Sequence, residues 1–250
     1  MDIFREHFKN FTDKYVLIGG VACSEAMVDT PQEFRTTKDL DIVLLIETHD
    51  TDFVKAFWDF IEAGGYTDKK KSPDKKQFYR FTNPTNKTYP VQLELFSRRP
   101  DILDIQENAH LTPLPVDDDL SSLSAILLDD NYYEFIQSGK EVIKDLSILG
   151  PGHLIPLKIK AYAELKQRKD KGERIDSHSI KKHRNDVFRL VKIIVPTQKI
   201  KIGDPIAEDI SNGLKLLVAE ENIDQTSKEF SGRSIDETIS ILTDIYMLNG

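Results

Sequence analysis

Two aspartates in the first fifth of the chain have the type and spacing of a catalytic pair. Asp39 and Asp41 flank Leu40 directly before the apolar run Ile42–Ile46. Side chains alternate along a strand, so both carboxylates would share one face. Two such carboxylates repel each other unless a cation lies between them, and Mg²⁺ is the hard divalent cation that accepts carboxylate and phosphate oxygens together. The pattern predicts a magnesium site.

A glycine pair lies upstream of these aspartates. The apolar stretch Tyr15–Ile18 runs into Gly19 and Gly20 and continues as Val21 and Ala22. Glycine lets the backbone bend and approach a ligand closely, so the pattern predicts a buried strand that turns sharply into a helix. The amides at the start of that helix make the turn a candidate phosphate cradle. The alternative is an ordinary core turn beside two solvated surface aspartates.

Together the two features resemble a known superfamily. Ile18-Gly-Gly-Val-Ala22 followed by Arg35-x-Thr-x-Asp39-Leu-Asp41-Ile resembles the DNA polymerase beta-like nucleotidyltransferases, and most closely the abortive-infection toxins of the AbiEii/AbiGii type. The resemblance implies an α+β fold, in which a small mixed sheet flanked by helices is followed by a C-terminal helical domain. It also implies in-line transfer of a nucleoside monophosphate from a nucleoside triphosphate to a hydroxyl, with release of pyrophosphate.

The site that this reaction requires is assigned to named residues. Asp39 and Asp41 are expected to hold two magnesium ions, which activate the nucleophile and clamp the triphosphate. Gly19 and Gly20 are expected to let backbone amides reach the phosphates, and Ser24 and Lys38 are expected to join them as nucleotide contacts.

A third carboxylate is expected on a neighbouring strand. Gln77–Phe81 and Tyr89–Phe96 alternate in polarity around a turn-rich connection, which predicts an antiparallel hairpin. Glu94 lies on the opposite face from Leu93 and Leu95, and its segment resembles the one that carries the third acidic residue in the superfamily. Glu94 is therefore interpreted either as a metal ligand or as the base that deprotonates the attacking hydroxyl. An outward-facing sheet glutamate is the alternative.

The C-terminal part carries a second set of candidates. Leu157–Arg168 and Lys182–Leu190 resemble the helical part of the same toxin family. Lys158 is accordingly expected to contact the nucleotide phosphates, and Asp186 to orient Lys158 or Arg168. For Lys158 the alternative is a surface lysine, and for Asp186 it is a structural salt bridge.

The elements that must position these residues follow from periodicity. Helices are predicted over residues 2–12, 22–28 and 53–61, the last ended by Gly64-Gly65. Glu141–Leu149 is predicted to return as one edge strand. Gly150-Pro-Gly152 is the predicted domain boundary, which separates a catalytic domain, 1–150, from a helical domain, 151–250, whose last helix begins with a Ser234/Glu237 capping box.

The composition of the chain indicates its expected location and excludes some kinds of site. The chain has 250 residues, 39% of them apolar and 30% charged. No apolar run is long enough for a membrane helix, and the segment that begins at Met1 lacks the apolar core of a signal peptide. A cytoplasmic location without membrane contact is therefore expected. Cys23, the single cysteine, excludes an intrachain disulfide. All six histidines are interpreted as surface residues.

Charge makes broad binding to nucleic acid unfavourable. The net charge is −8, so contact with nucleic acid needs a local basic patch. The best candidate is the group Lys69–Lys71, Lys75, Lys76 and Arg80, which is interpreted as a solvated hairpin loop.

Several functions are compatible with this site. The resemblance implies the toxin of a toxin–antitoxin pair that acts on RNA such as transfer RNA, with a separately encoded antitoxin as partner. The same residues would also serve a nucleotidyltransferase that modifies a small molecule, such as an antibiotic hydroxyl, or a protein. A catalytically silent binding module would keep the fold without binding a magnesium nucleotide.

Overall fold

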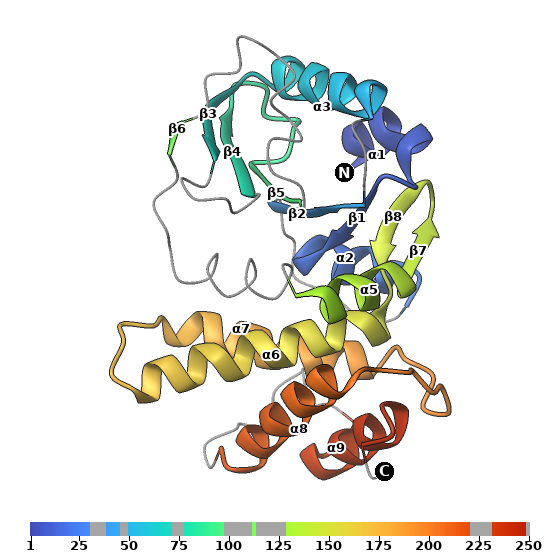
Figure 1. The fold of residues 1–250 in the computed structure, drawn as a ribbon, viewed down its shortest axis with the longest axis vertical. Coiled ribbons are helices and arrows are strands. Elements are labelled where there is room, and N and C mark those ends of the chain that lie inside the picture. The colour runs from blue at the N-terminus through green and yellow to red at the C-terminus, as the bar shows by residue number, and fades with distance from the viewer. Residues whose placement is uncertain are drawn as a thin grey trace. The chain divides into compact units, whose positions relative to one another are not determined.

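The fold is α+β (Figure 1). The computed structural model describes residues 1–30, 39–45, 50–71, 78–97, 112–113, 129–220 and 232–248. The chain divides into two compact units. The sheet unit comprises Met1–Ala26, Arg35–Leu128 and Lys140–Leu149, and the helical unit comprises Met27–Phe34, Asp129–Gly139 and Gly150–Gly250.

One mixed sheet organises the sheet unit. Its strands, within the described ranges, are β1 (Tyr15–Ile18), β2 (Asp39–Leu44), β3 (Tyr66–Lys71), β4 (Phe78–Pro84), β5 (Gln92–Phe96), β6 (Thr112–Pro113), β7 (Lys140–Ile143) and β8 (Leu146–Leu149). Their spatial order is β6-β3-β4-β5-β2-β1-β8-β7. The central pair β2–β5 is parallel, whereas β1–β2 and β4–β5 are antiparallel. The predicted hairpin of β4 and β5 is confirmed.

Aromatic side chains bury one face of this sheet. Helices α1 (Asp2–Phe8) and α3 (Thr51–Gly64) carry them, and the short turn η1 (Lys9–Phe11) follows α1. Phe4 of α1 contacts Tyr15 of β1 and Phe60 of α3, each at 5.6 Å between ring centroids. Phe57 and Trp58 contact Phe81 of β4 at 5.5 and 5.9 Å. The aromatic stripe of α3 is therefore core.

The opposite face of the same strands is polar at one end. Phe81 pairs in register with Leu93, and Leu93 with Leu40, so these side chains lie under α3. Strand alternation then directs Asp41 and Glu94 away from α3. The sheet thus separates the aromatic core from the acidic residues.

Turn and capping chemistry set the ends of the elements as predicted. Helix α2 (Gly19–Met27) begins directly after β1, at a glycine with φ of +68°. Asp50 caps α3 by accepting from the Phe53 amide, and Gly65 ends it in the left-handed conformation. The Ser234/Glu237 capping box of the last helix is present.

The helical unit contains α5 (Asp130–Ser138), α6 (Pro151–Asp170), α7 (Ser177–Val191), α8 (Asp204–Val218) and α9 (Ile235–Ile245). Figure 1 shows α6 and α7 side by side. Within the described ranges, no helix combines the length and the apolar character that a bilayer crossing requires.

Three sequence predictions need correction. Residues 141–149 form two strands rather than one, because Lys144 and Asp145 adopt positive φ and reverse the chain, and β8 lies inside the sheet while β7 forms its edge. Lys69–Lys71 belong to β3, so they are not loop residues. Arg80 lies in β4. The rest of that basic run, 72–77, falls outside the described residues.

The expected boundary at residue 150 coincides with the passage from β8 to α6. Helix α5, however, groups with the later helices, so the helical unit is built from separate segments of the chain. That each unit acts as a domain in its own right stays a prediction.

Candidate active site

Strand β2 carries the two aspartates at its beginning. Its burial alternates, since Asp39 is exposed, Leu40 is buried and Asp41 is half-buried. The two carboxylates leave the same face of the strand. Asp41 lies deeper in the sheet, where it has neighbours on both sides: Ile18 of β1 and Glu94 of β5 are its partners in register.

Glu94 lies beside Asp41 in the centre of the sheet. The residue is only 8% exposed, and its carboxyl group is within hydrogen-bonding distance of that of Asp41. Adjacent in-register side chains on one sheet face approach within contact distance, which accounts for the pairing. The structure thus brings Asp41 and Glu94 together, whereas Asp39 remains at the exposed end.

A cation from the next strand completes the row. Arg80 of β4 is the register partner of Glu94, and it donates from Nε and Nη2 to Oε1 at 2.8 and 2.7 Å. Gln92, two positions before Glu94 on β5, donates from Nε2 to the same oxygen at 2.9 Å. We call Arg80, Glu94 and Asp41 the charged row, since they lie side by side on three neighbouring strands.

On the same face of the sheet, the residues on the two sides of the charged row differ in polarity. Val16, Val43 and Phe96 form an apolar row toward one end of the strands. Toward the other end, Thr82, Gln92 and Asp39 form a polar row. A polar ligand would therefore approach from the side of Asp39, where β2 and β5 begin and where β1 passes into α2.

Burial and the Asp41 charge act on the pKa of Glu94 in one direction, and Arg80 acts in the other. Burial, followed by the neighbouring Asp41 charge, raises the pKa of its carboxyl group to about 8, although Arg80 lowers it. The charge of Asp41 thus opposes ionisation of Glu94 despite the nearby guanidinium. A bound cation would favour the ionised form of both carboxyl groups.

Gly19 makes room for Asp41. A Cβ atom at this position would lie 1.7 Å from Oδ2 of Asp41, and the φ of +68° is itself one that side-chain-bearing residues rarely adopt. Gly20 and Ser24 follow in α2, buried and half-buried respectively. Lys38 lies outside the described residues.

The donor set fits a divalent cation in kind. Asp41 and Glu94 are hard oxygen donors held side by side, and their mutual repulsion is the condition that a cation relieves. Among the described residues, no three His, Cys, Asp or Glu side chains gather around one point. The metal site with Asp39 as its third carboxylate therefore stays a prediction.

The second set of candidates lies in the helical unit. Nζ of Lys158 in α6 is 3.4 Å from Oδ2 of Asp186 in α7, and the two side chains are 7% and 0% exposed. Nη1 of Arg189 reaches the other oxygen of Asp186 at 3.2 Å. Lys158 is thus not a surface lysine. Nε of Arg168 is 2.7 Å from Oε2 of Glu173.

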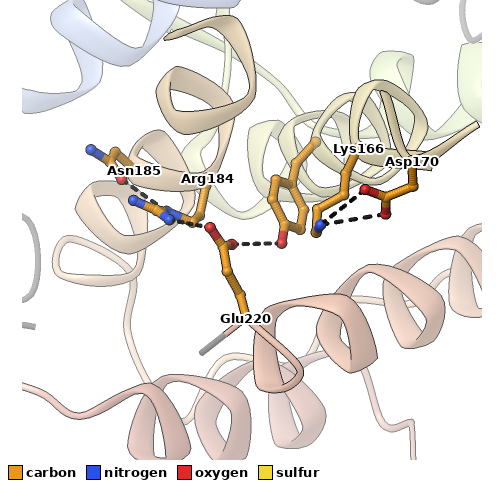
Figure 2. A network of polar contacts seen from close by, with 6 residues as sticks. Lys166, Asp170, Arg184, Asn185 and Glu220 are labelled. Atoms are coloured by element: carbon orange, nitrogen blue, oxygen red, sulfur yellow. Dashed lines mark hydrogen bonds and ion pairs between the residues drawn. The ribbon is translucent and has the colours of Figure 1, made fainter. Parts of the chain in front are cut away.

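A separate polar cluster joins three helices of this unit. Figure 2 shows Glu220, just after α8, accepting from Nη1 of Arg184 in α7 at 2.6 Å. The hydroxyl group of Tyr162 in α6 donates to the other carboxylate oxygen at 2.9 Å. Arg184 and Tyr162 are buried. None of these residues was predicted as a site residue, and their contacts stabilise the packing of α6, α7 and α8.

Sequence reasoning missed Arg80 as a site residue, because its neighbours in the chain place it in a basic run of lysines. The signal that identifies it is strand alternation, since Arg80 and Thr82 share a face in β4 whereas Tyr79 and Phe81 share the other. Antiparallel pairing with β5 then places that polar face beside Glu94.

The comparisons with known proteins differ in outcome between sequences and solved structures. No protein-family model and no curated protein matches the chain. Among solved structures, the chain is similar to an antigenic nucleotidyltransferase-like protein from Paracoccidioides brasiliensis, with a TM-score of 0.43 and 15% sequence identity over 93% of this chain and 94% of that one. At this distance the similarity carries no argument about activity.

Proposed function

We propose that the protein is a metal-dependent nucleotidyltransferase, which transfers a nucleoside monophosphate from a nucleoside triphosphate to a hydroxyl group. The observation that carries the proposal is the pair Asp41 and Glu94, two carboxyl groups in hydrogen-bonding contact on adjacent strands beside the Gly19 turn. Like-charged groups concentrated in this way are costly without a function, and they cluster at sites of chemistry.

In this proposal Asp41 and Glu94 hold magnesium, with Asp39 joining from the same strand face. Bound magnesium would offset the charge of the triphosphate and lower the pKa of an attacking hydroxyl. Glu94 is either a ligand or the group that accepts the proton of the hydroxyl. A bound cation would favour the ionised form of Glu94, which is the form that can accept this proton.

The start of α2 is the proposed phosphate site. Gly19 and Gly20 place no side chain of their own where the helix begins, and amides at a helix start favour anions. Ser24 and Lys38 are proposed as further nucleotide contacts. In the helical unit, Lys158 is proposed to contact the triphosphate and Asp186 to hold the lysine in place, a role that their buried ion pair supports.

The acceptor is proposed from the residues that resemble AbiEii/AbiGii toxins. We infer a toxin of a toxin–antitoxin pair that modifies RNA such as transfer RNA, with an antitoxin protein as partner. Modification of a small molecule or of a protein would use the same charged row. A silent binding module would lack magnesium-dependent binding of the triphosphate.

The test is label transfer. The protein is incubated with magnesium, transfer RNA and each ribonucleoside triphosphate in turn, labelled at the α-phosphate, and the RNA is resolved on a denaturing gel. We expect labelled RNA with the wild type. In Asp41→Asn we expect the rate of label transfer to fall by at least about 100-fold, because this variant loses the carboxylate proposed to hold magnesium during the reaction. Matched reactions contain an aminoglycoside or a protein extract instead of RNA.

Each outcome selects one function. Label on RNA supports the toxin, and label on the small molecule or on a polypeptide selects the corresponding alternative. If no acceptor is labelled and calorimetry detects no magnesium-dependent triphosphate binding, the enzyme proposal is wrong.

A further inference from the structure

The two carboxylate oxygens of Glu94 have different surroundings. Oε1 accepts from Nε and Nη2 of Arg80 and from Nε2 of Gln92, at 2.7 to 2.9 Å. Asp41 lies on the other side of Glu94, on β2. The contacts to Oε1 therefore restrict the rotation of the carboxyl group, and Oε1 is the oxygen that Arg80 and Gln92 hold.

This arrangement needs an arginine. A glutamate side chain has three rotatable bonds, and in the absence of a fixed partner a carboxylate next to Asp41 would turn away from the like charge. The planar guanidinium of Arg80 directs two N–H groups at one oxygen, and its side chain is itself only 19% exposed. Lysine would offer a point charge without this fixed direction.

The location of Arg80 also separates it from the ligand. It lies in β4, beyond Glu94 as seen from Asp41, so it is the last of the three members of the charged row. A cation held between Asp41 and Glu94 would meet carboxylate oxygens and not the guanidinium. Arg80 is therefore placed to act on Glu94.

We propose that Arg80 is the positioning residue of Glu94, which it holds through one carboxylate oxygen so that the other oxygen is directed toward Asp41 and toward a divalent cation. The inference rests on the proposed function, because it assigns Glu94 to cation binding. Groups that orient metal ligands in this way contribute about 10- to 100-fold to metal affinity or activity.

The matched control is another arginine–glutamate pair of the sheet unit. Arg5 of α1 donates from Nη2 to Glu25 of α2 at 3.1 Å, and these side chains are 24% and 11% exposed, against 19% and 11% for Arg80 and Glu94. Arg5→Ala thus removes a comparable ion pair outside the charged row, together with the contact of Arg5 with exposed Asp2 at 2.7 Å.

The experiment measures Mn²⁺ binding by electron paramagnetic resonance, together with label transfer, in the wild type, Arg80→Ala, Arg80→Lys, Glu94→Gln and Arg80→Ala/Glu94→Gln. We expect Arg80→Ala to bind Mn²⁺ about 10-fold more weakly or worse, with partial recovery in Arg80→Lys. Free guanidinium ion, far below denaturing concentrations, should restore part of the loss in Arg80→Ala. Arg5→Ala should bind like the wild type.

The double variant decides whether Arg80 acts through Glu94. If it does, removing Arg80 from Glu94→Gln has no further effect on Mn²⁺ affinity, and the two single losses do not add. A full additional loss would overturn the inference, as would wild-type affinity in Arg80→Ala. Thermal unfolding shows which variants fold, and Arg80→Lys replaces Arg80→Ala if the latter does not.

Failure of the proposed function has a different signature. If the wild type neither binds Mn²⁺ nor transfers label, both proposals fall. If the wild type does both and Asp41→Asn does neither, the function stands, and the behaviour of Arg80→Ala alone decides the positioning role.

Discussion

Gly19 is the residue at which backbone conformation and site geometry meet. Its positive φ turns the chain from β1 into α2, and its missing side chain leaves the space that the Asp41 carboxylate occupies. Either requirement would favour glycine. Together they make this position a direct probe of how the site is built.

We predict that Gly19→Ala is more destabilising than its backbone conformation alone explains. The left-handed backbone costs about 1–2 kcal/mol for a residue with a side chain, and displacement of Asp41 adds to that cost. The measurement is the free energy of unfolding in urea. Gly172→Ala is the control, since Gly172 has φ of +92° and a Cβ atom added there would meet nothing within 4 Å.

The comparison isolates the contact with Asp41. Equal losses in the two variants would show that Asp41 moves aside without cost. A larger loss at Gly19, accompanied by weaker Mn²⁺ binding, is the expected result.

Among the elements, α6 connects most of the helical unit. It contributes Lys158 to the buried ion pair with Asp186 and Tyr162 to the contact with Glu220. His153 in its first turn packs against Phe135 of α5, with 4.5 Å between ring centroids. Its side chains thus contact α5, α7 and the residue that follows α8.

We predict that Glu220→Ala lowers the free energy of unfolding by about 1–3 kcal/mol, because it leaves the buried Arg184 and Tyr162 without this acceptor. Asp170→Ala is the control. It removes an exposed partner of Lys166 in the same view (Figure 2) and should change stability by less than about 0.5 kcal/mol. Similar losses of stability in both variants would contradict a stabilising role for the buried contacts of Glu220.

His153 gives the helical unit a dependence on pH. Burial lowers the pKa of its imidazole from 6.5 to about 4, so the prediction that all six histidines are surface residues is wrong for this one. Between these pH values an unfolded chain binds a proton that the folded chain does not. Stability contributed by neutral His153 is therefore complete above about pH 6.5 and is lost as pH falls toward 4.

We predict that His153→Phe, which keeps an aromatic ring against Phe135, flattens this dependence. The slope removed is at most about 1.4 kcal/mol per pH unit, which is one proton. Urea unfolding from pH 7 to pH 5 measures it in the wild type and the variant. Parallel curves would mean that His153 is not the responsible group.

For the whole molecule, the α+β class was implied by the family resemblance, and sequence periodicity was enough to predict individual helices and strands. The turn at Gly19, the β4–β5 hairpin and the Ser234 cap follow from local rules. Strand β3 was missed because Tyr66–Lys71 is half lysine and lacks the apolar alternation by which strands are recognised. The grouping of α5 with later helices depends on packing between distant segments, which local patterns do not contain.

The candidate site was predictable to a similar extent. Asp41 and Glu94 were singled out by their places on apolar strands, but their adjacency depends on the pairing of β2 with β5. The role of Arg80 needs that pairing and the one with β4 as well. The burial of Lys158 depends on α6 packing against α7, and no pattern around Lys158 indicates it.

The charged row also bears on how the protein acquires its chemistry during synthesis. Asp41 comes from a strand that is distant in sequence from the β4–β5 hairpin, which carries Arg80 and Glu94. A shift of one residue in the pairing of β5 with β2 or with β4 would turn Leu93 or Phe81 onto the polar face. No partly synthesised chain that lacks β5 can contain the pair Asp41 and Glu94. Contacts between distant segments form late and slowly. Correct strand pairing and a competent site would therefore arise in one step, and catalytic activity would report the fraction of chains that have folded in register.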